Sequence, residues 1–177
     1  DPNEMNFNAL QYGVEYQRVV EMADRYGNAV IVIRGHSDPT KTLRDLVKAG
    51  LAKGVIKESG SGKARKYFIK GKPLDLESTK DVVQLIEAGE FDGVAEFNPR
   101  ETMQSALNLS KSRADAVRKS IVGFAKEKGL QLDLTQVTSV GVGIKEPLIA
   151  KPSSMEEAKQ NMRVEFRLVR VPAEVMT

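Results

Sequence analysis

The stretch AVIVIRGHSDP, residues 29–39, decides the fold because it joins an apolar segment to a polar loop and a helix start. Residues Ala29 to Arg34 are mostly β-branched, and the run is short enough for a buried strand. Gly35-His36-Ser37-Asp38 follows as a polar loop, and Pro39 suits the first position of a helix. We therefore predict a strand, a loop and a helix in succession, with Asp38 at the helix start.

Helical spacing of apolar residues predicts three helices around this stretch. The first helix runs from Tyr12 to Tyr26, and the second begins at Pro39 and is ended by Gly54. The third runs from about Leu109 to Lys128, with Asn108 or Ser110 as its cap. The other predicted elements are a hairpin at 55–69, a helix at 78–88, strands at 137–142 and 163–171, and a helical turn at 155–159.

The composition is that of an ordinary globular chain. Its 177 residues, 41% of them hydrophobic and 29% charged, are enough for one domain with its own core. It has no cysteine, so disulfides play no part, and no apolar run approaches the roughly 20 residues that a membrane helix needs. The net charge of +3 supplies no strong field for nucleic acid. The chain begins at Asp1 without a basic, apolar leader, so we expect a piece of a longer protein.

Charge is divided along the middle of the chain. Residues 41–72 hold ten basic side chains against Asp45 and Glu58, whereas residues 73–101 hold eight acidic side chains against two basic ones. Two solvated faces that attract each other explain this division most simply. A basic surface for an anionic polymer is the less favoured alternative.

Two charged residues are the best candidates for a binding site. Asp38 ends the polar loop, and Arg113 lies in Leu109-Ser110-Lys111-Ser112-Arg113-Ala114, which we place in the first turn of the long helix. A carboxylate and a guanidinium from facing elements suit a ligand that carries an ammonium and a carboxylate together. Free backbone N–H groups in a first helical turn would also favour the anionic end of that ligand.

Simpler roles stay open for each of these residues. Asp38 can serve only as the helix cap, and Arg113 can pair with Asp38 or with a surface acid. His36 is the only histidine, and a hydrogen-bonded structural role suits it better than catalysis. Because the sequence has no cysteine and no second histidine, we predict no metal site. The glycine-containing runs at 60–64 and 141–143 lack the residues of a phosphate loop or a dinucleotide fingerprint, so we predict no cofactor.

Four short blocks of the sequence stand out together. They are Gly35-His36-Ser37-Asp38, Leu109-Ser110-x-x-Arg113-Ala114-x-x-Val117, Gly141-x-Gly143-x-x-x-Pro147 and Asn161-x-Arg163-Val164-Glu165. In this order they resemble the OmpA-like peptidoglycan-binding domain of bacterial cell envelopes. They match the family's GHSD, LSxxRAxxV, GxGxxxP and NRRVE in order, except that Met162 replaces the first arginine of the last block. The resemblance covers roughly residues 12–38 and 105–171.

The resemblance implies an α/β two-layer sandwich, with a mixed sheet and helices packed on one side. Residues 1–177 would form a single domain of this kind. Residues 39–104 would be an insertion of a helix, a hairpin and a helix, because the family leaves far fewer residues between its first two blocks. Apolar and polar residues show little alternation between Asp1 and Leu10, so we expect the family's first strand to be truncated. Ala106 stands where an asparagine is common, which would remove one polar contact.

The resemblance also implies non-covalent peptidoglycan binding in the periplasm, in a protein associated with the outer membrane, and no enzymatic reaction. Asp38 and Arg113 would hold the ammonium and the carboxylate of diaminopimelate in the stem peptide. Ser37 and Leu109 would line the pocket. Arg163 would add positive charge near the ligand, although a solvated strand end is an equal alternative for it.

Two other functions fit the same residues. One is a periplasmic protein-interaction module on the same fold, with the insertion at 39–104 as its binding surface. The other, less favoured, is an enzyme in which His36 and Asp38 form an acid–base pair. We expect no nucleic-acid partner and no direct membrane insertion by this part of the protein, and the oligomeric state stays open.

Overall fold

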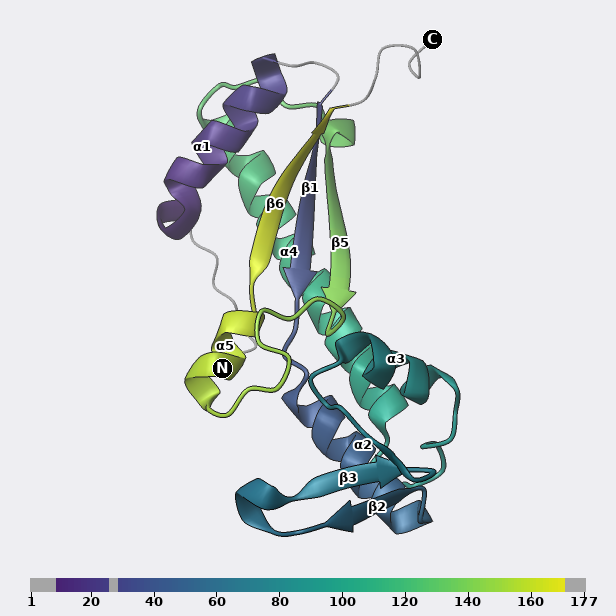
Figure 1. Ribbon diagram of the computed structural model, residues 1–177. Helices are drawn as coiled ribbons and strands as arrows, with labels where there is room; N and C mark the ends of the chain where they lie inside the picture. The colour runs from purple at the N-terminus through teal and green to yellow at the C-terminus, as the bar shows by residue number, and fades with distance from the viewer. Residues whose placement is uncertain (1–8, 26–28, 171–177) are drawn as a thin grey trace. The chain divides into compact units, whose positions relative to one another are not determined.

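The computed structural model describes residues 9–25 and 29–170 (Figure 1). Its elements are α1 (Ala9–Arg25), β1 (Ala29–His36), α2 (Thr40–Lys53), β2 (Ile56–Ser59), η1 (Gly62–Ala64), β3 (Lys66–Ile69), β4 (Lys72–Pro73), α3 (Thr79–Glu87), α4 (Pro99–Glu127), η2 (Leu134–Gln136), β5 (Val137–Gly143), α5 (Met155–Asn161) and β6 (Val164–Arg170). The mixed α/β class predicted from the sequence is confirmed. Residues 1–8, where a truncated first strand was expected, lie outside the described residues, as do Tyr26 and Val171 at two predicted element ends.

The chain divides into two compact units. The first unit comprises the chain up to His36, Asn108–Val142 and the chain from Arg163 onward. The second unit comprises Ser37–Leu107 and Gly143–Met162. It therefore contains the predicted insertion at 39–104 together with a later segment, and helix α4 supplies residues to both units.

In the first unit, strand β1 lies between β5 and β6 in a three-stranded sheet. β1 and β6 are antiparallel, with Ala29 opposite Arg170, whereas the arrows of β1 and β5 point the same way (Figure 1). β1 alternates buried and half-buried residues over most of its length. Ile31 and Ile33 therefore face one side, where they share a core with residues of α1 and α4.

An aromatic cluster joins α1 to the rest of this core. Tyr16 is fully buried, and its ring lies edge-on to Phe124 of α4, at 5.9 Å between ring centroids, and to Phe166 of β6, at 5.7 Å. Such edge-to-face pairs add to the free energy gained by burying the rings. Val164 and Leu168 of β6 pack against the same core.

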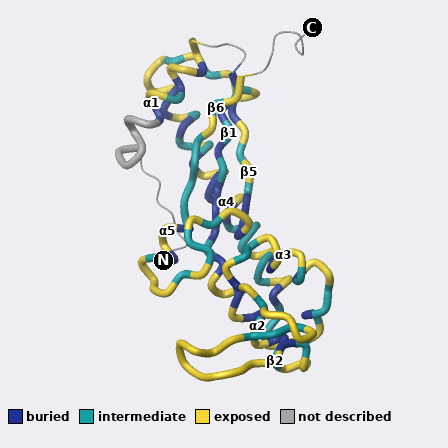
Figure 2. Tube along the Cα trace, viewed as in Figure 1, coloured by how far each residue is buried: buried dark blue, intermediate teal, exposed yellow. Residues whose placement is uncertain are grey.

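The second unit is built on α2 and a small antiparallel sheet in the order β2-β3-β4. Ile56 lies opposite Ile69 in the sheet, and both contact the core that α2 and α3 also form. Gly54 ends α2, as predicted, in a left-handed conformation with φ of 73°, where its N–H donates to the last carbonyls of the helix. The loop between β2 and β3 is exposed (Figure 2).

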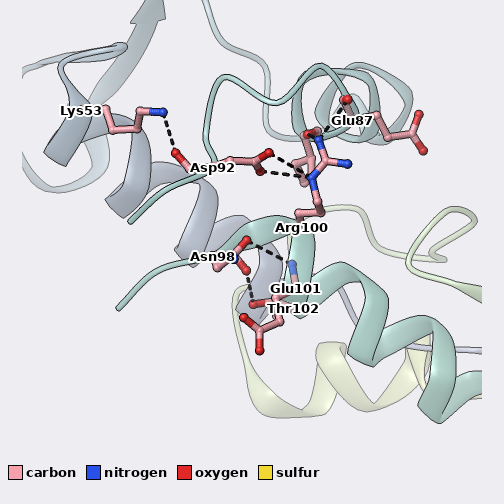
Figure 3. Close-up of polar contacts among 8 residues, drawn as sticks. Lys53, Glu87, Asp92, Asn98, Arg100, Glu101 and Thr102 are labelled. Carbon is pink, nitrogen blue, oxygen red and sulfur yellow. Dashed lines mark hydrogen bonds and ion pairs between the residues drawn. The ribbon is translucent and has the colours of Figure 1, made fainter. Parts of the chain in front are cut away.

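Helix α4 begins at Pro99, well before the predicted start at Leu109. Asn98 Oδ1 accepts a hydrogen bond from the Glu101 N–H at 3.2 Å, so Asn98 caps the helix and Pro99 takes its first position (Figure 3). Every residue between Pro99 and Leu109 can continue a helix, because the run contains neither glycine nor a second proline.

The predicted cap of this helix is therefore wrong. Asn108 and Ser110 lie within α4, and Arg113 lies in its interior rather than in its first turn. Backbone N–H groups in a helix interior donate to carbonyls one turn earlier. Hence the expected contribution of free N–H groups beside Arg113 does not hold, and any ligand contact there must come from the side chain.

Candidate functional site

The first block occupies the end of β1, where the strand approaches α4 closely. A Cβ atom on Gly35 would lie 2.0 Å from the carbonyl oxygen of Ser110 and 3.3 Å from the Ala114 Cβ. No side chain fits into that space, so the position requires glycine. The missing side chain lets the backbone of the first block meet the second block directly.

His36 is fully buried at this strand end. The backbone N–H of His36 donates to the backbone carbonyl of Arg163 at 2.9 Å, and the ring Nε2 lies 3.5 Å from Glu165 Oε2. Arg163 Nε donates to the other oxygen of the same carboxylate at 2.7 Å. Burial alone would raise the pKa of Glu165, but the hydrogen bond and charge of Arg163, with the charges of His36 and Arg167, hold that pKa below its usual value. These contacts agree with a structural role for His36.

Arg113 is a buried cation of the first unit, with 3% of its surface exposed. Its Nη1 donates to the carbonyl oxygen of His36 at 2.8 Å. Its Nε is buried and has no hydrogen-bond partner among the residues that the structure describes. Burial lowers the pKa of Arg113, yet a guanidinium keeps its proton at neutral pH. Arg113 therefore has donor capacity left beyond its bond to His36.

Ser37 is buried in the second unit and held from two sides. Its N–H donates to the Gly143 carbonyl at 2.8 Å, and its Oγ donates to the Ala106 carbonyl at 2.7 Å. The first of these bonds connects the first block to the third. The second uses only the backbone of Ala106, so it does not depend on the side chain at that position.

Asp38 is half-buried and uses both of its carboxylate oxygens. Oδ2 accepts a hydrogen bond from the N–H of Thr40, the first residue of α2, at 3.0 Å. Pro39, and not Asp38, takes the cap position of α2 and has no side-chain cap bond, so the predicted cap at Asp38 and the predicted helix start at Pro39 each lie one residue too early. Oδ1 accepts a hydrogen bond from Asn161 Nδ2 at 2.8 Å. A carboxylate offers about four acceptor positions, so these two bonds leave room for a further donor.

Asn161 is the residue that sequence reasoning missed. It is fully buried, and its side chain makes four hydrogen bonds. Oδ1 accepts from the N–H groups of Leu148 at 2.8 Å and Ile149 at 2.9 Å, while Nδ2 donates to the Ile149 carbonyl and to Asp38, each at 2.8 Å. Asn161 thus fixes the loop before α5 and the Asp38 carboxylate together. The only signal in the sequence is that it opens the fourth block.

The structure places Ser37 and Asp38 in the second unit, and Leu109, Arg113 and Arg163 in the first. Leu109 is half-buried on α4. Across residues 9–25 and 29–170, no group of histidine, cysteine, aspartate and glutamate could hold a metal ion. Within the same described ranges, no helix combines the length and apolar character needed to cross a membrane.

Three comparisons with known proteins give no relative: the chain matches no protein-family model, no curated protein and no solved structure. The OmpA-like resemblance therefore rests on the four blocks alone.

Proposed function

We propose that this chain binds peptidoglycan non-covalently in the periplasm of a Gram-negative bacterium, through the diaminopimelate of the stem peptide. The supporting observation is the set of hydrogen bonds made by the first block. Arg113 of the second block, Gly143 of the third and Asn161 of the fourth each share a hydrogen bond with that block. Such bonds are expected if the four blocks serve one function.

The proposed chemistry assigns one end of diaminopimelate to each charged residue. Asp38 would accept hydrogen bonds from the ammonium through lone pairs that Thr40 and Asn161 do not use. Arg113 would bind the carboxylate through N–H groups that it does not give to His36. Both side chains are already held by protein contacts, so binding would cost little side-chain entropy. No bond is made or broken, and we propose no enzymatic reaction.

The proposal carries a finer fold assignment with it. The chain would be an OmpA-like domain, associated with the outer membrane in the whole protein, and residues 39–104 would be an insertion in it. Ser37, Leu109 and Arg163 would complete the surroundings of the ligand. Of these three, Ser37 and Arg163 are already engaged by the protein, through Ala106 and Glu165, so we expect them to shape the site more than to bind the ligand.

Sedimentation with purified peptidoglycan sacculi tests this function. The unmodified chain should sediment with the sacculi. Asp38→Asn and Arg113→Lys should each weaken binding by about tenfold or more, because the first removes the charge that meets the ammonium and the second removes the bidentate bond to the carboxylate. Arg113→Lys is the sharper variant, since it keeps the positive charge and removes only the planar fork that matches a carboxylate.

Matched controls exist for both variants. Asp133→Asn repeats the first change at an aspartate that, like Asp38, accepts from the N–H two residues later, here that of Thr135 at 2.8 Å. Arg118→Lys repeats the second in the same helix, at an arginine whose Nε donates to a backbone carbonyl at 3.0 Å. Both controls should bind as the unmodified chain does. If the unmodified chain fails to sediment with the sacculi, the proposed function is wrong. If Asp38→Asn and Arg113→Lys fold and bind as well as the unmodified chain, the proposed site is wrong.

A further inference from the structure

A cavity of about 300 Å³ lies in the second unit, and none of the residues proposed to bind peptidoglycan lines it. Helix α2 forms one wall through Leu43 and Val47, which lie one turn apart on the same face. Leu76, between β4 and α3, and Tyr67 on β3 also line the cavity. Leu43 and Leu76 are also part of the core of the unit, so the packing of the interior fixes these walls.

Three cations and no acid line the same cavity: Arg44, Lys48 and Lys151. Lys48 Nζ lies 4.9 Å from the centroid of the Phe97 ring, a contact that restrains this side chain. None of the three cations takes part in an ion pair with another described residue. Asp45 follows Arg44 in the helix, but it is buried and accepts a hydrogen bond from Thr102. Among the described residues, no acidic side chain therefore lines the cavity or pairs with its three cations.

We propose that this cavity binds a small organic anion, with an aromatic or branched apolar body and one acidic group. The apolar body would lie against Leu43 and Leu76, and burial of its surface would drive binding. The acidic group would lie toward Arg44, Lys48 and Lys151, which would select an anion over a neutral molecule of the same shape. The volume is at the lower end for ligand sites, which favours a small molecule. This inference does not depend on peptidoglycan binding.

A pair of fluorescent dyes separates the two contributions. Anilinonaphthalene sulfonate has an apolar ring system with one acidic group, and phenylnaphthylamine has the same ring system without the sulfonate. In equilibrium titrations of the whole chain, we expect one saturable site that prefers the sulfonate dye. Arg44→Gln together with Lys48→Gln should lower the affinity for the sulfonate dye about tenfold and leave the affinity for the neutral dye unchanged. Higher salt should reduce the same preference.

Two further variants make the test decisive. Val47→Trp fills the cavity and should weaken both dyes, with Val47→Leu as the milder version if the larger side chain prevents folding. Lys41→Gln together with Lys80→Gln removes two exposed cations of the same unit that do not line the cavity, and it should change neither affinity. Equal affinity for the two dyes, equal weakening by the control pair, or dye binding without saturation would each overturn the proposal.

Discussion

Gly35→Ala is expected to lower the free energy of unfolding by about 3 kcal/mol. The added Cβ would lie 2.0 Å from the Ser110 carbonyl oxygen and 3.0 Å from its carbonyl carbon. Both are backbone atoms of a helix, so no side chain can rotate away to make room. β1 and α4 would have to separate at the end of the strand, next to Ala114 of the core of the first unit. Urea denaturation followed by circular dichroism measures the change through the midpoint and the slope.

Gly123→Ala is the matched control for this substitution. Gly123 lies in α4, the helix that Gly35 contacts. It is exposed, and a Cβ there would have no heavy atom within 4 Å. Alanine should therefore raise stability at that position by about 0.5–1 kcal/mol, because it loses less backbone entropy in a helix. If Gly35→Ala were as well tolerated as Gly123→Ala, the close approach of β1 to α4 would be incorrect.

Asn161→Asp is expected to destabilise the second unit by about 2–4 kcal/mol at neutral pH. The change keeps the oxygen that serves Leu148 and Ile149, but it replaces the Nδ2 donor with a second oxygen. That oxygen would lie 2.8 Å from the Asp38 carboxylate and from the Ile149 carbonyl. The repulsion would weaken the contact that holds Asp38, so peptidoglycan binding should fall as well.

The pH dependence of this variant has a definite sign. Burial and the charge of Asp38 would raise the pKa of the introduced carboxyl group in the folded chain above its unfolded value of about 4. The loss of stability caused by Asn161→Asp is therefore largest above the pKa of this carboxyl group in the folded chain. It disappears as the pH falls toward about 4, where the protonated group can again donate to Asp38. Gln160→Glu makes the same change of charge at the exposed neighbour in α5, and it should cost little. A penalty independent of pH would contradict the contact with Asp38.

Several elements could be predicted because their signals are local. The β-branched run at 29–34 became the body of β1, and Gly54 ended α2 because only a left-handed residue closes that helix in this way. The glycine-containing turn at 60–62 separated the two strands of the hairpin. Asp38 was also placed correctly beside the start of α2, where it accepts a hydrogen bond from the Thr40 N–H, although Pro39 takes the cap position.

The contacts that matter most for the candidate site could not be predicted in this way. Ser37 bonds to Gly143 and Asp38 bonds to Asn161, across more than a hundred residues in each case. No periodicity or cap encodes such pairs, because tertiary packing brings them together. The start of α4 was missed for a different reason. The second block was taken as the beginning of a helix, whereas Asn98 and Pro99 supply the true start upstream.

Titration of the whole chain with two stem peptides, followed by NMR, tests the central proposal most directly. One peptide carries diaminopimelate and the other carries lysine in its place, so they differ by a single carboxylate. We predict that the diaminopimelate peptide binds about tenfold more tightly or better, and that Arg113→Lys abolishes this preference. Equal binding of the two peptides, or binding of neither, would contradict the proposal that Arg113 and Asp38 hold diaminopimelate.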